Sequence, residues 1–152
     1  MKFIRVLKSR NGKRIDFEKI EPEMEKIAKR FDILLIYLYG SYATNSAGKL
    51  SDLDIAFLPA REFDLDNTLD LLDDLQDRFE EEAIDLINLN QVPLTLIHRV
   101  FKEGRCLYAR DLRIRIEFEV RKEHLYYDTA PLRELYFNAL KRRIQNGTYG
   151  YR

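Results

Sequence analysis

The feature that most constrains the fold is an uninterrupted apolar run, ILLIYLY at positions 33–39, which ends at Gly40. Its length is typical of a β-strand, and apolar side chains on both sides of a strand require cover on both faces of the sheet. A second apolar run covers positions 53–59, and the two are joined by a polar loop. The sequence therefore predicts a small mixed sheet covered by helices, which is the α+β class.

Other segments fit around these two runs. A β-hairpin is predicted near the N-terminus, because Asn11-Gly12 favours the positive φ angles of a tight turn between 3–7 and 14–17. Apolar periodicity and turn residues divide the rest of the chain into alternating elements. We expect helices at 18–32, 66–79, 93–103 and 131–145, and strands at 33–39, 52–58, 83–89 and 105–109.

The helix expected at 66–79 has polar residues at its start and an apolar face along its length. Asp66-Asn67-Thr68 supplies side chains that can cap a helix N-terminus. Leu69, Leu72, Leu75 and Phe79 then recur at spacings of three and four, which predicts the buried face. The acidic residues between them are expected to face solvent.

The segment 112–120 fits two structures equally well. LRIRIEFEV alternates apolar and charged residues as a strand does, yet Leu112, Ile116 and Val120 also follow a helical i, i+4 spacing. Periodicity alone leaves both possibilities open.

Length and composition narrow the class of protein. The 152 residues fit one domain, 1–152, and 26 basic against 26 acidic residues give a net charge of zero. We therefore expect no direct stable binding to nucleic acid. The lone Cys106 excludes an internal disulfide, and the N-terminal residues hold no apolar block long enough for a signal peptide or membrane span. These features indicate a soluble protein of the cytoplasm.

Two aspartates stand at the start of the second apolar run. In a strand, alternate side chains face the same side, so Asp52 and Asp54 would project together with Cα atoms about 6.5–7 Å apart. Leu53, Ile55 and Phe57 would face the other way. Adjacent carboxylates repel each other unless a cation lies between them, and a hard divalent ion prefers oxygen ligands. The pair therefore predicts an Mg²⁺ site.

A third aspartate and a Gly-Ser pair extend this prediction. Asp85 lies inside the apolar run AIDLINL, where an unpaired carboxylate would be costly to bury. If the strands at 52–58 and 83–89 are neighbours, Asp85 can join the pair around two metal ions. Gly40-Ser41, at the end of the apolar run 33–39, is followed by a short helical turn. Its N–H groups and the serine hydroxyl can bind a triphosphate.

Together these residues resemble a known signature. Gly40-Ser41, a ten-residue interval, Asp52-Leu53-Asp54 and Asp85 on a later strand are similar to the motifs of the DNA polymerase β-like nucleotidyltransferase superfamily. Within it the chain looks most like minimal nucleotidyltransferases (MNT), the antitoxins of HEPN/MNT toxin–antitoxin pairs. The resemblance implies the polymerase β-like fold, with a catalytic core at about 18–110, a C-terminal helical extension at about 111–147, and a helix at 112–120.

The resemblance also implies roles for these residues. Asp52 and Asp54 would hold two Mg²⁺ ions, and Asp85 would hold the catalytic ion and help to deprotonate the attacking hydroxyl. Gly40 and Ser41 would bind the β- and γ-phosphates of ATP. The family transfers AMP to a tyrosine hydroxyl of a HEPN-type RNase toxin, which implies a hetero-oligomer with that toxin.

One departure from the family pattern bears on activity. Many relatives carry Arg or Lys and then Gly after the alanine, where this chain has Thr44-Asn45. The missing cation would have to come from Lys49 or from a partner. Two alternatives therefore stay open: an MNT antitoxin that acts by binding alone, and a nucleotidyltransferase of the aminoglycoside-modifying type. The second would need an added acceptor domain, for which the 43 residues after Ala109 are few.

Overall fold

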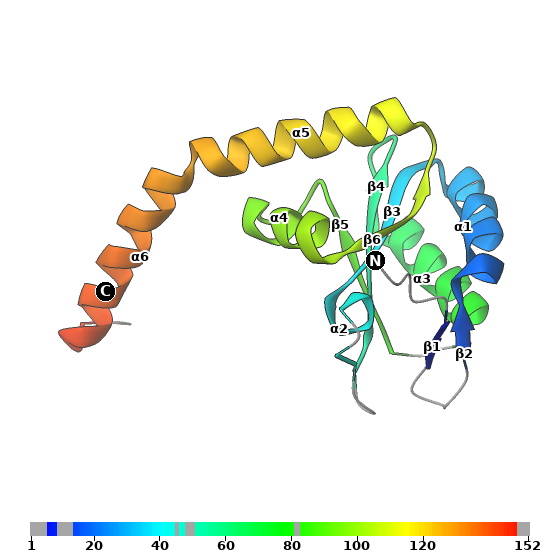
Figure 1. Ribbon diagram of the computed structural model, residues 1–152, viewed down its shortest axis with the longest axis horizontal. Coiled ribbons are helices and arrows are strands. Elements are labelled where there is room, and N and C mark those ends of the chain that lie inside the picture. Colours follow the sequence, from blue (N-terminus) through cyan, green and yellow to red (C-terminus); the bar gives the residue numbers. More distant parts are fainter. Residues whose placement is uncertain (1–5, 9–13, 45, 48–50, 81–82, 149–152) are drawn as a thin grey trace.

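The structure is a computed structural model that describes residues 6–8, 14–44, 46–47, 51–80 and 83–148, with side chains from Ile20 onward (Figure 1). Its elements alternate along the chain much as expected. In order they are β1 (Val6–Lys8), β2 (Arg14–Asp16), α1 (Phe17–Phe31), β3 (Ile33–Tyr39), α2 (Gly40–Ala43), β4 (Leu53–Pro59), α3 (Leu65–Phe79), β5 (Ile84–Asn88), α4 (Leu94–Glu103), β6 (Arg105–Ala109), α5 (Leu112–Asp128) and α6 (Ala130–Gln145).

The central sheet has the order β5-β4-β3-β6 within the described residues. β3 pairs antiparallel with β4 and with β6, whereas β4 and β5 are parallel. The strands expected at 52–58 and 83–89 are therefore neighbours, and the prediction of a small mixed sheet is confirmed. The separate β1–β2 pair is antiparallel, as expected for the hairpin, although its predicted Asn11-Gly12 turn lies outside the described residues.

Helices cover both faces of this sheet. On one face, Met24 of α1 and Leu71 of α3 belong to the same buried cluster as Ile36, Ile55 and Phe57. A second cluster on the other face joins the sheet to α4 and α5; its buried members include Leu35, Tyr37, Tyr39, Ala56, Ile97, Val100 and Phe118. β3 is thus buried on both sides, as its apolar run requires.

Two details of α3 differ from the sequence-based expectation. The cap is Asp64, whose carboxylate accepts a hydrogen bond from the N–H of Asn67 at 2.8 Å, so the helix begins before the predicted Asp66. The buried face is Leu71, Leu75 and Phe79, whereas Leu69 is 50% exposed. Both sets of leucines satisfy helical spacing, and only packing against α1 and the sheet selects between them.

The ambiguous segment 112–120 is helical, which confirms the structure implied by the family resemblance and excludes the strand. Asp111 caps α5 by accepting a hydrogen bond from the N–H of Arg113 at 2.6 Å. Phe118 is buried against the sheet and packs edge-on against Phe101 of α4. The cap and this single deep contact explain why an alternating sequence forms a helix here.

α6 continues from α5 and extends away from the sheet (Figure 1). None of its residues 130–145 is buried, although the structure describes all of them. The apolar residues predicted to form the buried face of this helix are therefore not covered by the other described residues; the exposed ones include Leu132, Leu135, Tyr136 and Ile144. None of the described helices has the length and apolar character needed to cross a membrane.

A hydrogen bond from a buried tyrosine of β3, Tyr37, links the sheet to α5. The hydroxyl of Tyr37 donates a hydrogen bond to Glu119 Oε1 at 2.7 Å, and Nε of Arg115 donates to the same oxygen at 2.8 Å. Burial, followed by the Glu119 carboxylate, raises the pKa of Tyr37, so the phenol stays a donor at neutral pH.

We expect Tyr37→Phe to lower the free energy of unfolding by about 1–2 kcal/mol, because Glu119 loses a buried donor. Denaturant unfolding measures this value. Tyr136→Phe is the matched control: its side chain is 65% exposed, and the same loss of a hydroxyl should change stability by less than about 0.5 kcal/mol. Equal effects of the two substitutions would contradict the stabilising role of the Tyr37 hydrogen bond.

Candidate functional site

The parallel pairing of β4 with β5 brings two of the predicted aspartates together. Asp54 and Asp85 are Cα partners in the register of these strands, and adjacent strands lie about 4.8 Å apart. Both side chains project from the sheet face that α4 covers, whereas Ile55 and Phe57 face α1 and α3.

Asp85 differs from the prediction in one respect. Its flanking residues predicted a carboxylate inside a buried strand, but the side chain is exposed. The reason is that β5 lies at the edge of the sheet and pairs only with β4 among the described strands. Asp85 is therefore open to solvent and to a second molecule, and burial is not what demands a partner for it.

Asp52 lies just before β4 and is exposed, whereas Asp54 is half-buried. The pKa of Asp54 is raised above its ordinary value, first by burial and then by the negative charges of Asp85 and Asp52. Arg99 of α4 opposes this shift. The negative charges of Asp85 and Asp52 thus both act on the Asp54 carboxylate.

The backbone of Gly40 lies in close contact with the Asp54 carboxylate. Tyr39 is the β3 partner of Asp54, so the residue that follows it lies directly beside the carboxylate. Gly40 has φ +69°, and a Cβ at this position would overlap Asp54 Oδ2 and lie 2.8 Å from Asp54 Cγ. Only glycine satisfies both the backbone conformation and the close approach.

Ser41 follows Gly40 in the predicted helical turn, which is α2, and is partly exposed. Thr44 ends the turn: its N–H donates to the carbonyl of Gly40 at 3.2 Å, and its hydroxyl lies 2.8 Å from Ser46 Oγ. Thr44 therefore closes the loop through local bonds and brings no charge to it. Asn45 and Lys49, which the sequence also singled out, lie outside the described residues.

Sequence reasoning missed two residues beside the carboxylates. Tyr39 is buried, and its pKa is raised by burial and then by the charges of Asp85 and Asp54. Arg99 supplies positive charge that acts on both Tyr39 and Asp54. Tyr39 looked like one more apolar residue of its strand, and nothing in the local pattern around Arg99 connects α4 with β4.

The donor set suits a hard divalent cation. Asp52, Asp54 and Asp85 offer carboxylate oxygens, and the missing Cβ of Gly40 lets Asp54 Oδ2 approach the backbone of the α2 turn closely. A cation there would also relieve the repulsion that raises the pKa of Asp54. No three His, Cys, Asp or Glu side chains in the described part of the chain are already grouped as a metal site. The oxygen donors of these residues nevertheless fit the chemistry of Mg²⁺.

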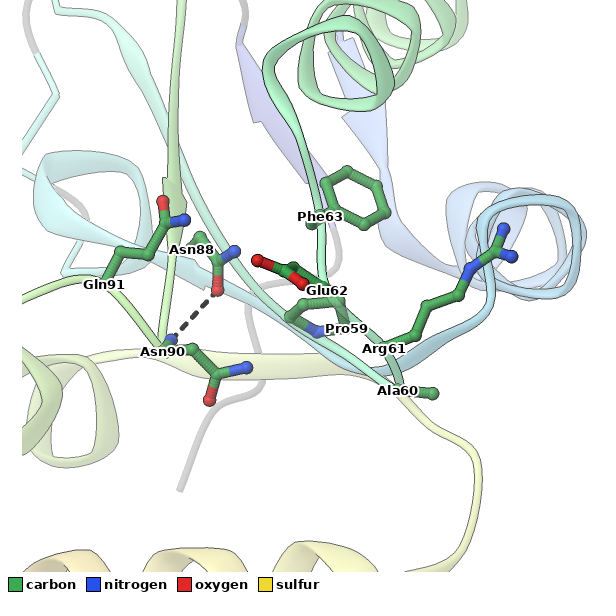
Figure 2. Close-up of a pocket in the computed structure, with 8 residues that line it drawn as sticks. All are labelled: Pro59, Ala60, Arg61, Glu62, Phe63, Asn88, Asn90 and Gln91. Carbon is green, nitrogen blue, oxygen red and sulfur yellow. Dashed lines mark hydrogen bonds between the residues drawn. The ribbon is translucent and has the colours of Figure 1, made fainter.

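A separate pocket of about 360 Å³ lies away from the carboxylates. Figure 2 shows its lining at the far ends of β4 and β5, where the side chain of Asn88 accepts a hydrogen bond from the N–H of Asn90 at 2.9 Å. Five residues along β4 separate Asp54 from Pro59 of this pocket, which corresponds to about 17 Å. The pocket is therefore not part of the carboxylate site.

Comparison with known proteins supports the fold. The family described as "Polymerase beta, Nucleotidyltransferase" matches residues 18–113, which contain Gly40, Ser41 and all three aspartates. No curated protein sequence matches the chain.

Solved structures of toxin–antitoxin complexes have a similar fold. A chain in the crystal structure of a toxin–antitoxin with AMP-PNP is 24% identical with a TM-score of 0.69, and the match covers 80% of this chain and 98% of that one. A chain in the complex of the tri-AMPylated Shewanella oneidensis HEPN toxin with its MNT antitoxin is 23% identical with a TM-score of 0.66; the match covers 82% and 98%. These similarities confirm the predicted polymerase β-like fold.

Proposed function

Because the chain belongs to the polymerase β nucleotidyltransferase family, we propose that it transfers AMP from ATP to a tyrosine hydroxyl of a HEPN-type RNase toxin and thereby neutralises the toxin. The observation that carries the proposal is the register of β4 and β5, which sets Asp54 opposite Asp85 and beside the bare backbone of Gly40. This arrangement places carboxylate oxygens that can bind a cation directly beside the α2 turn, whose Ser41 hydroxyl can contact a phosphate.

The proposed roles follow from the position of each residue. Asp52, Asp54 and Asp85 would hold two Mg²⁺ ions, which neutralise charge on the triphosphate and on the attacking oxygen when bound. Gly40 and Ser41 would contact the β- and γ-phosphates, because the α2 turn is next to Asp54. Asp85 would also orient the acceptor hydroxyl and accept its proton.

The reaction is a substitution at the α-phosphorus. A new bond forms between the tyrosine oxygen and the α-phosphorus, the bond from that phosphorus to the bridging oxygen breaks, and pyrophosphate leaves. Because Asp85 is exposed on an edge strand, the hydroxyl of a second protein can reach it. A macromolecular acceptor therefore fits this edge better than a small molecule enclosed in a pocket.

The proposed partner comes from the structural neighbours. Two of them are complexes with toxins, one with AMP-PNP and one in which the HEPN toxin is AMPylated. These support ATP as the nucleotide and a HEPN toxin as the acceptor in a hetero-oligomer. We place the reaction in the cytoplasm, where ATP and Mg²⁺ are available.

An RNase assay with a HEPN-type RNase toxin as the partner tests the proposal. Preincubation of the toxin with the wild-type chain, ATP and Mg²⁺ should abolish RNA cleavage. After preincubation with Asp85→Asn under the same conditions, the toxin should keep at least about 90% of its cleavage activity, because the acceptor hydroxyl is no longer activated. Asp77→Asn, which changes an exposed aspartate of α3, is the matched control and should neutralise the toxin fully. Neutralisation that needs no ATP and survives Asp85→Asn would instead establish an antitoxin that acts by binding alone.

A further inference from the structure

α4 lies along the sheet face that carries the carboxylates. Its buried residues Ile97 and Val100 belong to the same cluster as Tyr39, and the helix contacts both β3 and α2 (Figure 1). α4 therefore runs beside the turn that begins at Gly40.

Arg99 is an exposed basic residue of α4 and directly precedes the buried Val100 in the sequence. Its side chain is 61% exposed, and Nε donates a hydrogen bond to Glu103 Oε2 at 3.1 Å. Its positive charge lies close enough to lower the pKa of both Asp54 and Tyr39 against the effect of burial. An exposed ion pair within one helix contributes little to stability, so the guanidinium can exchange Glu103 for another anion at small cost.

We propose that Arg99 binds the triphosphate of the nucleotide and supplies from α4 the cation that the Gly40–Thr44 turn lacks. The assignment rests on the proposed function, because it concerns the same nucleotide site. A guanidinium suits this role since its planar donors match two phosphate oxygens at once. Thr44 cannot take it, because its hydroxyl is uncharged and already bonded within the turn.

The positive charge of Arg99 gives it a different role from the carboxylates, because it attracts phosphate and not metal ions. The carboxylates Asp52, Asp54 and Asp85 attract a cation, and Arg99 repels one. Its charge therefore favours a ligand that brings excess negative charge, and ATP brings more of it than AMP. Discrimination between these two nucleotides is the consequence that distinguishes a direct contact from a structural role.

Calorimetric titration of the purified chain with ATP and with AMP, each with Mg²⁺, tests the assignment. Arg99→Ala should weaken ATP binding about tenfold to a hundredfold, the expected effect of losing a charge-assisted hydrogen bond. The affinity for AMP should change less than about twofold, because only the β- and γ-phosphates lose their partner. Since Arg99 is exposed, the thermal melting temperature should stay close to that of the wild type.

Two further variants complete the experiment. Glu103→Gln removes the present partner of Arg99 and should leave ATP binding as tight or tighter; Arg121→Ala, on the exposed side of α5, is the matched control and should bind ATP like the wild type. Unchanged ATP affinity in Arg99→Ala, an equal loss for AMP and ATP, or an equal loss in Glu103→Gln would each overturn the assignment. A wild-type chain that binds no ATP would overturn the proposed function, and this assignment with it.

Discussion

Asp54→Asn is expected to abolish AMP transfer and, at the same time, to raise the melting temperature of the metal-free chain at neutral pH. Activity should fall by about a thousandfold or more, because a metal ion contributes several kcal/mol to stabilisation of the transition state and the central ligand is lost. Stability should rise because burial, followed by the negative charges of Asp85 and Asp52, disfavours the ionised form of Asp54 in the folded chain. Radiolabel transfer from ATP and thermal melting measure the two effects.

The direction of the stability change follows from the pKa of Asp54. Its pKa in the folded chain is raised, so folding favours the protonated form, and the associated stability is lost as the pH rises through that pKa. At neutral pH the ionised carboxylate therefore destabilises the fold. The difference in melting temperature between Asp54→Asn and the wild type should shrink as the pH falls toward about 4, the ordinary pKa of an aspartate, because the wild-type residue then becomes neutral as well.

The control is Asp70→Asn, which removes an exposed carboxylate of α3 and should change neither activity nor melting temperature. Adding Mg²⁺ should stabilise the wild type more than Asp54→Asn, because binding to the folded state adds stability. A lower melting temperature for Asp54→Asn in metal-free buffer would contradict the repulsion on which the cation site rests.

Gly40→Ala is expected to have the second largest effect, on both activity and stability. The new Cβ would overlap the Asp54 carboxylate at a residue with φ +69°, so either the turn or the carboxylate must move. Left-handed strain and overpacking together should cost about 2–4 kcal/mol. Transfer should fall to background, because the Asp54 carboxylate and the α2 turn can no longer lie side by side as they do now.

Gly147→Ala is the matched control. Gly147 has φ +64°, but a Cβ there meets nothing within 4 Å. Gly147→Ala should lower the free energy of unfolding only by the cost of the left-handed conformation, at most about 1–2 kcal/mol at the exposed end of α6. It should keep full activity. Denaturant unfolding and the transfer assay separate the two variants. If Gly40→Ala retains transfer, the close approach of Gly40 to Asp54 has no functional role.

Most of the fold could be predicted from the sequence because its strongest signals are local. The apolar run of β3 required cover on both faces of the sheet, and the DxD spacing placed Asp54 on one face with Ile55 and Phe57 on the other. Predictions failed where two local patterns were equally good. Leu69 and Leu71 both suit a helical stripe in α3, and contacts with distant elements decide that Leu71 is buried.

The surroundings of the site could be predicted only in part. Asp85 was expected in a buried strand, but the order of strands puts β5 at the edge of the sheet, and strand order is not encoded in a single apolar run. The same limit applies to Arg99 and Tyr39. Their relation to Asp54 depends on how α4 packs on β3, which involves residues far apart in the sequence. The roles of Gly40, Ser41 and the three aspartates stay predictions until variants are measured.

The measurement that tests the central claim most directly is the intact mass of a HEPN-type RNase toxin after incubation with the chain, ATP and Mg²⁺. The account predicts a gain of one or more adenylyl groups, located on tyrosine by fragmentation, that appears with the wild type and is absent with Asp54→Asn. A toxin that loses its RNase activity in the presence of the wild-type chain while its mass stays unchanged would contradict the account.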